Sequence, residues 1–359
     1  MNSHNIAILQ PLVPHYRTEF FKLLDDKVNL LDIYVYYSYD QVLKQGFSID
    51  EIKLYKIYNL EFKGVLWYNP FKLLQKKYDT IVLMWHFAHI TTWILLLTKF
   101  IHRKKIIVWG HGISVKRYLM EERRPNCLLK LMLFLSDGAW VYMHKEAKKW
   151  QNIFPNKDIV ALNNTLSGVK DIVDYKPLHN KDELKKMYKI KEKRILLFCA
   201  RFNNPFRRID LLIETIEKLN KDTFGFVIIG DGIYKPNFTQ YCNVYDFGAV
   251  YDVNIKQDLF TLSDLYFQPG WVGLSIVEAM AYGKPICTFI RNEETLHCVE
   301  YSYIVEKENG LIFKDINDCI DKLNSINIDD IMTMGNNAKK LVKEKLSICN
   351  MVENAISIL

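Results

Sequence analysis

The sequence predicts an α/β protein built from two doubly wound domains, each around a parallel sheet. Short apolar runs alternate with amphipathic segments along almost the whole chain, which is typical of repeated βα units. The 359 residues exceed one typical core and suit two domains of roughly 150–200 residues each. A hydrophobic fraction of 49% and an aromatic fraction of 13% indicate a folded chain rather than a disordered one.

The elements fall into two series separated by a charged stretch. In the first domain, 1–170, we expect strands at 5–10, 31–37, 80–84, 105–109 and 138–142, and helices at 18–24, 91–100, 125–135 and 145–150. The stretch 171–193 contains one proline and few large apolar residues, so we interpret it as a linker. In the second domain, 194–337, we expect strands at 194–200, 224–230, 265–268 and 285–289, and helices at 209–219, 255–261 and 274–282. The segment after Ile331 has a helical pattern.

The charge and cysteine content narrow the function classes. A net charge of +7 suits an anionic small ligand or an anionic membrane surface, and no basic patch with interleaved aromatics points to nucleic acid. Seven scattered cysteines without a CxxC pair, and a beginning without the apolar core of a secretory signal, predict a reduced, cytoplasmic protein. The longest strongly apolar run, 93–97, is too short to span a membrane.

The most informative segment is 273–286, which reads GLSIVEAMAYGKPI. A glycine turn leads into a short helix with one carboxylate, and a second glycine is followed by an apolar strand. The backbone amides at a helix N-terminus bind phosphate well. Glu278 lies about one turn further in, where it suits a sugar hydroxyl. A nucleotide with a ribose and a diphosphate fits both features, although an ordinary helix–strand unit would have the same outline.

This segment resembles the C-terminal signature of family 4 glycosyltransferases. Further pieces that resemble the family are ILLFCARF at 195–202, RRIDLLI at 207–213, FVIIGDG at 226–232, VYDFG at 244–248, SDLYFQP at 263–269 and ENGLIF at 308–313. The resemblance implies the GT-B fold, with two Rossmann-like domains facing a central cleft. It also implies that the C-terminal helix, about 338–359, packs back on the first domain.

The resemblance implies a donor site for a nucleotide-diphosphate sugar, UDP- or GDP-linked. Arg201 and Arg207 would lie on one loop at the carboxyl end of a strand and clamp the diphosphate through charge-assisted hydrogen bonds. The amides at Gly273, Leu274 and Ser275 would add to this clamp. The alternative is that Arg207 is a solvated surface charge, as we expect for the neighbouring Arg208.

The same resemblance assigns the nucleotide. Glu278 would hold the ribose, and Gly230, Phe247 and Gly248 would frame the base. No Asp-x-Asp triplet is present, and His86 and His89 have no acidic partner nearby in the sequence, so we expect neither a metal nor another cofactor.

One position departs from the family pattern. The family typically carries a second glutamate eight residues before the first, where it contacts the donor sugar. That position is Gly270 here, within PGWVGL. The transferred sugar therefore cannot be inferred from the family at large, and backbone groups of 271–273 would have to replace the carboxylate.

The first half matches less closely. The segment 10–17, QPLVPHYR, resembles a subset of polysaccharide-cluster transferases with a Pro-x-Tyr-Arg opening. His15, Tyr16 and Arg17 would line the acceptor side and meet acceptor or phosphate, or else cap the first helix. His111, in the WGHG run at a strand end, matches a family histidine that contacts the donor sugar near the reaction centre. A structural histidine in a tight turn is the alternative.

Taken together, these residues and the resemblance predict a glycosyltransferase that acts on a glycan or lipid-linked acceptor. The resemblance implies that it retains the anomeric configuration and works in bacterial surface polysaccharide synthesis, of the capsule or O-antigen type. His111 and Glu278 are its predicted catalytic residues. A GT-B sugar-nucleotide epimerase or hydrolase, or a non-catalytic GT-B partner subunit, remains open. The mixed apolar and basic segment 91–105 suggests peripheral contact with an anionic membrane, although a buried helix with a basic turn has the same pattern.

Overall fold

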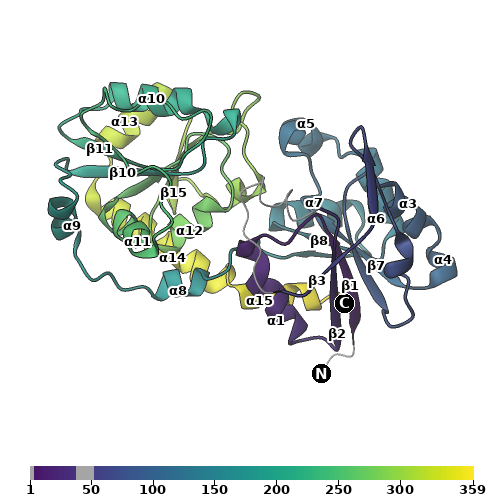
Figure 1. Ribbon diagram of the computed structural model, residues 1–359. Coiled ribbons are helices and arrows are strands. Elements are labelled where there is room, and N and C mark those ends of the chain that lie inside the picture. Colours follow the sequence, from purple (N-terminus) through teal and green to yellow (C-terminus); the bar gives the residue numbers. More distant parts are fainter. Residues whose placement is uncertain (1–3, 38–51) are drawn as a thin grey trace. The chain divides into compact units, whose positions relative to one another are not determined.

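The structure, a computed structural model, describes residues 4–37 and 52–359. The chain divides into two compact units, Met1–Gly168 with Ile348–Leu359 and Val169–Ser347. Each unit has its own parallel sheet with helices on both faces (Figure 1).

The sheet of the first unit follows from continuous apolar runs, which are typical of parallel strands covered on both faces. Alternate residues of a strand point to opposite faces. In the first strand Ile6 and Ile8 therefore pack into one core cluster, whereas Ala7 and Leu9 pack into the other. In spatial order the strands are β3 (Leu54–Lys56), β2 (Leu30–Val35), β1 (Asn5–Gln10), β6 (Thr80–Met84), β7 (Lys105–Gly110), β8 (Gly138–Val141) and β9 (Asp158–Ala161).

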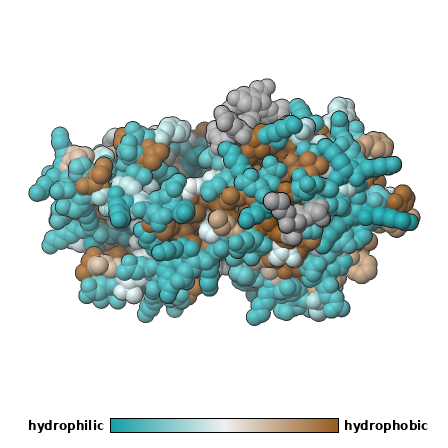
Figure 2. All heavy atoms as spheres, turned by 90° about the horizontal axis from the view of Figure 1, so that it is seen from below, coloured by the Kyte–Doolittle hydropathy of each residue, from teal (hydrophilic) through white to brown (hydrophobic). Residues whose placement is uncertain are grey.

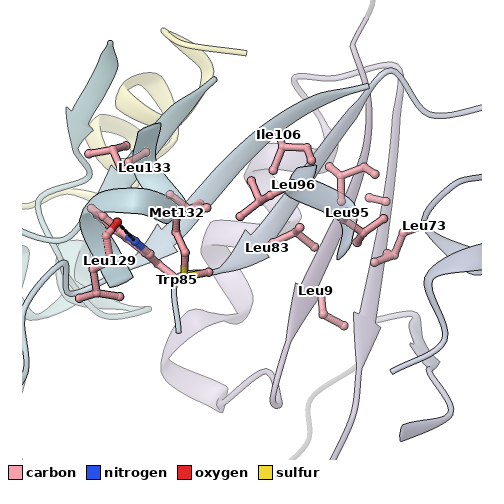
Figure 3. Packing of buried hydrophobic residues seen from close by; sticks show 14 of the residues in the cluster. Leu9, Leu73, Leu83, Trp85, Leu95, Leu96, Ile106, Leu129, Met132 and Leu133 are labelled. Carbon is pink, nitrogen blue, oxygen red and sulfur yellow. Dashed lines mark hydrogen bonds between the residues drawn. The ribbon is translucent and has the colours of Figure 1, made fainter. Parts of the chain in front are cut away.

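Helices cover the two faces of this sheet. One face packs against α1 (Thr18–Asp25) and α15 (Ile348–Ile356). The other packs against α3 (Ile90–Leu97), α6 (Cys127–Leu135) and α7 (His144–Ile153). Figure 3 shows the second cluster, in which Leu95, Leu96 and Met132 pack beside the strand residues Leu83 and Ile106. The remaining elements are η1 (His15–Arg17), the antiparallel hairpin of β4 (Asn59–Phe62) and β5 (Val65–Tyr68), η2 (Pro70–Lys72), α4 (Lys99–His102), η3 (Val115–Arg117) and α5 (Tyr118–Arg123).

The second unit repeats the arrangement with a six-stranded parallel sheet. In spatial order its strands are β12 (Val244–Asp246), β11 (Phe224–Ile229), β10 (Arg194–Cys199), β13 (Leu265–Phe267), β14 (Ile286–Phe289) and β15 (Gly310–Phe313). Figure 1 shows α10 (Ile209–Lys218) and α13 (Ile316–Ser325) on one face, with α11 (Val253–Leu262) and α12 (Ser275–Ala281) on the other. The other elements are η4 (Pro205–Arg207), η5 (Val299–Tyr303) and α14 (Ile328–Lys345).

The stretch 171–193 lies within the second unit and contains helices. Residues of α8 (Val169–Asp174) pack against α12 and α14. Helix α9 (Lys181–Met187) begins with a capping box, in which the Asn180 side chain accepts from the Glu183 amide and the Glu183 side chain accepts from the Asn180 amide. Leu184 is its buried contact. These local signals give the stretch regular structure despite its high charge.

The chain returns to the first unit between its last two helices. Helix α14 belongs to the second unit and α15 to the first, so the segment 338–359 is shared between them. Helix α15 packs on α1, and the Trp140 Nε1–H donates to the Ala355 carbonyl at 3.1 Å. The C-terminal helix thus completes one face of the first core.

Candidate functional site

The second sheet has a topological switch point between β10 and β13. From β10 the chain continues to β11 on one side, whereas β13 lies on the other side. In open α/β sheets ligands bind at the carboxyl edge beside such a point. Here the Tyr266 hydroxyl donates to the Cys199 carbonyl at 2.8 Å and joins the two strand ends. The segments carrying Arg201, Arg207 and the loop 268–274 all leave from this edge.

Arg207 is a half-buried cation at the end of η4. Its Nε has no hydrogen-bond partner among the described residues. Burial lowers the pKa of its guanidinium; Tyr266 and Cys298 oppose this shift, whereas the charge of Arg201 adds to it. A guanidinium remains charged at neutral pH, and an unsatisfied buried donor costs about 1–3 kcal/mol. Together with the charge of Arg201, this cation suits an anionic ligand at the carboxyl edge of the sheet.

Arg201 lies on the same loop and is exposed. Because its charge acts on the Arg207 guanidinium, the two predicted clamp residues are neighbours in the fold. Both side chains were expected from the sequence to lie on the loop after this strand, β10. Their part in ligand binding remains a prediction.

Glu278 is not an isolated carboxylate. Its Oε1 forms a 2.6 Å ion pair with Lys256 Nζ of α11, and both side chains are largely buried. Burial alone would lower the pKa of Lys256, but the Glu278 carboxylate reverses this and raises it. The pair holds the carboxylate in place on the first turn of α12.

Lys256 was not among the residues predicted from the sequence. The residue lies 22 positions before Glu278, on a different helix, so no local spacing links the two. Only the packing of α11 beside α12 reveals the contact.

The structure explains why position 270 is glycine. A Cβ at Gly270 would lie 2.6 Å from the Phe206 carbonyl oxygen, 2.8 Å from Arg208 Cγ and 3.1 Å from Arg208 Cβ. The space that a side chain would need is occupied by the η4 backbone and by Arg208. A carboxylate at this position is therefore incompatible with the loop as it is built here.

Arg208 is held by hydrogen bonds and is mostly buried, unlike a solvated surface charge. Its guanidinium donates to both Asp210 carboxylate oxygens and to Thr295 Oγ1, and its side chain is 19% exposed. The expectation of a free surface arginine was wrong, because η4 turns this side chain inward beside Gly270. The residue also adopts a left-handed backbone, with φ 55° and ψ 53°.

Trp271, on the loop 268–274, also has a strained, left-handed backbone, with φ 52°. Its ring stacks on Phe206, with centroids 5.3 Å apart and an angle of 23° between the planes. Gln268 Nε2 donates to the Trp271 carbonyl at 2.7 Å, while Ser275 Oγ donates to Gln268 Oε1 at 2.8 Å. A non-glycine residue at positive φ persists only where its surroundings hold it.

A buried histidine holds the next residue of the loop. The Val272 amide donates to His297 Nδ1 at 3.1 Å, so the ring is neutral and its Nε2–H donates to the Phe289 carbonyl at 2.8 Å. Burial lowers the pKa of His297 to about 3. These bonds fix the turn that leads to Gly273, Leu274 and Ser275.

The residues expected to frame the base lie together at the ends of β11 and β12. The Gly230 amide donates to the Gly248 carbonyl at 2.7 Å, and the Phe247 amide donates to the Ile228 carbonyl at 3.0 Å. Gly230 has φ 143°, and a Cβ there would come within 2.1 Å of the Ala200 carbonyl oxygen. The glycine is required by this close approach, whatever it binds.

In the first unit, His111 follows β7 in a tight turn and is exposed. Its ring lies 5.0 Å from that of Tyr142. The next residue, Gly112, has φ 66°, and its carbonyl accepts from Trp150 Nε1 at 2.9 Å. The turn is thus fixed by packing below it, and the imidazole projects from it.

The residues 15–17 form η1, immediately before α1. Arg17 is buried, and its guanidinium donates to Asn164 Oδ1 and to Met351 Sδ, the latter at 2.9 Å. Its side chain makes no capping bond to α1. Arg17 instead joins η1 to the segment after β9 and to the C-terminal helix. His15 packs edge-on against Tyr16, with centroids 5.6 Å apart.

The described residues contain neither a cluster of metal-ligating side chains nor a membrane-spanning helix. No group of three or more histidine, cysteine, aspartate or glutamate side chains in 4–37 and 52–359 could hold a metal ion. Over the same ranges, no helix has both the length and the apolar character needed to cross a membrane.

Among known protein families, the match lies within the second unit. Residues 193–327 match the family model described as Glycosyl transferases group 1. The match covers the second sheet, the arginine loop and the Glu278 helix. No curated protein matches the sequence.

Solved structures match nearly the whole chain. A glycosyltransferase from Rickettsia africae superposes with a TM-score of 0.67 at 16% identity, over 100% of this chain and 98% of that one. HepE from Anabaena in complex with UDP gives 0.65 at 14%, over 98% of each chain. The lipopolysaccharide outer core galactosyltransferase WaaB gives 0.63 at 14%, over 99% of this chain and 100% of that one.

The fold is GT-B. The prediction of this fold from the sequence is confirmed by these superpositions and by the two parallel sheets. At such identities the likeness establishes the architecture, and the chemistry must be argued from the residues of this chain.

Proposed function

We propose that the chain is a retaining glycosyltransferase that transfers a sugar from a UDP-sugar to a glycan or lipid-linked acceptor. The observation that carries the proposal is the half-buried guanidinium of Arg207, which lies beside the charge of Arg201 at the sheet's switch point. The family match over 193–327 supports it. UDP is preferred to GDP because HepE, which has the same fold, was crystallised with UDP and with UDP-glucose.

The diphosphate is the group for which this edge is best suited. Arg201 and Arg207 would bind its oxygens, and the amides at Gly273, Leu274 and Ser275 would add neutral donors. As the bond to the sugar breaks, negative charge grows on the leaving diphosphate, and fixed cations stabilise it without reorganisation. No metal is required in this scheme.

The nucleoside would lie beside the diphosphate. The Glu278 carboxylate would accept from the ribose hydroxyls, with Lys256 holding it in position at 2.6 Å. The turns at Gly230 and at Phe247–Gly248 would frame the base. We retain His111 as a proposed contact of the donor sugar, because Gly270 provides no carboxylate for that purpose.

The biological setting is also a proposal. WaaB is described as a lipopolysaccharide outer core galactosyltransferase, which favours surface polysaccharide synthesis in the cytoplasm for this chain. Phe100, Ile101 and Leu97 of α3 and α4 are 76%, 68% and 59% exposed, beside Lys99 and Arg103. Figure 2 shows hydrophobic residues among polar ones at the end of the view where α4 lies in Figure 1. We propose that this surface contacts an anionic membrane.

Calorimetric titration with UDP, GDP, ADP and CMP tests the donor site. We expect selective binding of UDP, weakened about 10–100-fold by Arg207→Ala, because a lost charge-assisted hydrogen bond costs about 1.5–3 kcal/mol. Arg123→Ala in the first unit removes the same charge and serves as the control. A folded Arg207→Ala protein with unchanged affinity for UDP would remove the proposed clamp.

Incubation with UDP-sugars separates the related activities. A transferase should leave the donor largely intact until an acceptor is added. Release of free sugar or an epimer from donor alone would instead indicate a hydrolase or an epimerase. Failure of the wild-type protein to bind any of the four nucleotides would indicate a non-catalytic partner subunit.

A further inference from the structure

An aromatic pair lies beside Arg207 in the second unit. Phe206 directly precedes Arg207 in η4, and its ring stacks on that of Trp271, with centroids 5.3 Å apart and 23° between the planes. Both residues of the pair are half-buried. The transferred sugar is bonded directly to the diphosphate of its donor. A diphosphate held by Arg207 therefore brings the sugar to the residues around Arg207, and this pair is among them.

The backbone amides next to the pair are already engaged. The Trp271 amide donates to the Leu296 carbonyl at 2.7 Å, and the Val272 amide donates to His297 Nδ1 at 3.1 Å. An amide N–H is a single donor, so neither group can hydrogen-bond a sugar without breaking these contacts. These two amides are therefore not available to replace a carboxylate at position 270.

The polar side chains next to the pair are engaged as well. Gln268 Nε2 donates to the Trp271 carbonyl at 2.7 Å. The Arg208 guanidinium donates to both carboxylate oxygens of Asp210 and to Thr295 Oγ1. A donor that exchanges one hydrogen bond for another gains little net free energy. The aromatic pair is therefore the surface that this part of the loop offers to a sugar.

The backbone of Trp271 indicates that its ring has a role of its own. Its φ of 52° lies in the left-handed region, which glycine adopts without steric cost and which is strained for a bulky residue. The turn itself therefore does not need a tryptophan. Strain of this kind persists where the surroundings hold it, and it clusters at ligand sites. The ring, rather than the turn, accounts for a tryptophan at this position.

We propose that the Phe206–Trp271 pair packs against an apolar face of the transferred sugar and determines which sugar is accepted. In a galacto-configured pyranose the axial 4-hydroxyl leaves C3–H, C4–H and C5–H together on the opposite face. Such a C–H face suits the negative face of an aromatic ring, and burying it removes apolar surface from water. The gluco epimer has a less continuous C–H face. The inference rests on the proposed transferase function and specifies a galacto-configured sugar as the group transferred.

Calorimetric titration of the full-length protein with UDP, UDP-galactose and UDP-glucose tests the inference. We expect the wild type to bind UDP-galactose at least about threefold more tightly than UDP-glucose. Trp271→Gly removes the ring and relieves the strained backbone. It should weaken UDP-galactose binding about tenfold more than UDP binding and abolish the preference over UDP-glucose. Trp271→Phe keeps an aromatic face and should retain most of the preference.

The exposed Trp67 of β5, in the first unit, provides the matched control, and Trp67→Ala should change none of these affinities. If Trp271→Gly does not fold, Trp271→Asn removes the ring with a residue that also adopts the left-handed region.

Three results would overturn the inference. The first is wild-type binding of UDP-glucose as tight as that of UDP-galactose, and the second is a folded variant without the ring that binds UDP-galactose like the wild type. The third is a wild type that binds UDP but neither UDP-sugar, which would leave the diphosphate site intact. Failure to bind any of the three ligands would instead overturn the proposed function, and this inference with it.

Discussion

The sharpest prediction concerns Gly270, where the resembling family carries a carboxylate. Gly270→Ala adds one Cβ, which would lie 2.6 Å from the Phe206 carbonyl oxygen and 2.8 Å from Arg208 Cγ. Real Cβ contacts essentially never fall below 3.0 Å, and the first of these atoms is backbone. The η4 turn or the 269–272 loop must therefore move. Gly273→Ala is the matched comparison, because its Cβ meets only Cys298, with Sγ at 3.8 Å.

The size of the effect follows from these distances. Overpacking a well-packed site costs about 1–3 kcal/mol. In a unit of this size each kcal/mol lowers the unfolding midpoint by about 2–4 °C. Gly273→Ala should instead leave the free energy of unfolding unchanged or raise it by up to about 1 kcal/mol, since alanine reduces the entropy of the unfolded chain. Gly270→Ala should also weaken UDP binding, because η4 carries Arg207.

Thermal and urea unfolding of the two variants provide the assay, together with calorimetric titration of Gly270→Ala with UDP. The reasoning fails if Gly270→Ala is as stable as Gly273→Ala and binds UDP like the wild type. In that case the loop would have room for a side chain. The missing carboxylate would then need an explanation other than the lack of space.

Three further predictions test other contacts. Acidification should lower the free energy of unfolding by up to about 1.4 kcal/mol per pH unit for each of His89 and His297, because only the unfolded state takes up the proton. The effect begins below the unfolded pKa near 6.5 and extends to the folded pKa values of about 4 and 3. In urea titrations His297→Phe should remove the His297 part of this pH dependence, and an unchanged dependence would refute the assignment. Lys256→Met should weaken the binding of UDP and of UMP by a similar factor of about 3–10, because the ion pair with Glu278 is lost. Arg207→Ala should weaken the binding of UDP more than that of UMP. If calorimetry gives both variants the same ratio of UDP loss to UMP loss, this division of roles is contradicted. Phe100→Glu should reduce co-sedimentation with vesicles of phosphatidylglycerol and phosphatidylcholine, while Leu178→Glu, at a 90% exposed position of the second unit, should not; equal effects would exclude α4 as the contact.

Most of the fold was accessible from the sequence because its central strands are continuous apolar runs. β1 and β6 have the expected limits, and β10 and β14 differ by one residue at an end. The missed elements are those whose secondary structure depends on contacts with neighbouring elements rather than on a local apolar pattern. β3 has three half-exposed or exposed residues and, among the described strands, pairs with β2 alone, so its apolar pattern is too short to recognise. Helices α8 and α9 were hidden by the charge of the stretch around them.

The candidate site was accessible in a similar way, up to the limit of local information. Arg201, Arg207 and Glu278 could be found because each lies just after a strand end or at a helix start. Lys256 could not, because its contact joins two helices through packing.

The departures at positions 208 and 270 lie in contact with each other. The segment 207–213 resembles a family motif that reads Lys-Gly-(hydrophobic)-Asp-Leu-Leu, so the family's glycine corresponds to position 208. This chain has Arg208 there, in a left-handed backbone at φ 55°. The Arg208 side chain then occupies the space beside position 270, with Cβ and Cγ at 3.1 and 2.8 Å from where a Cβ would lie. Its guanidinium is held there by Asp210 and Thr295. A side chain at 270 would therefore meet both the Phe206 carbonyl oxygen and the Arg208 side chain, and a tight turn stands where the resembled family carries a carboxylate. The loss of the glutamate is thus part of a rebuilt wall of the site rather than decay of an unused one, which favours an active transferase with its own sugar preference over a non-catalytic partner.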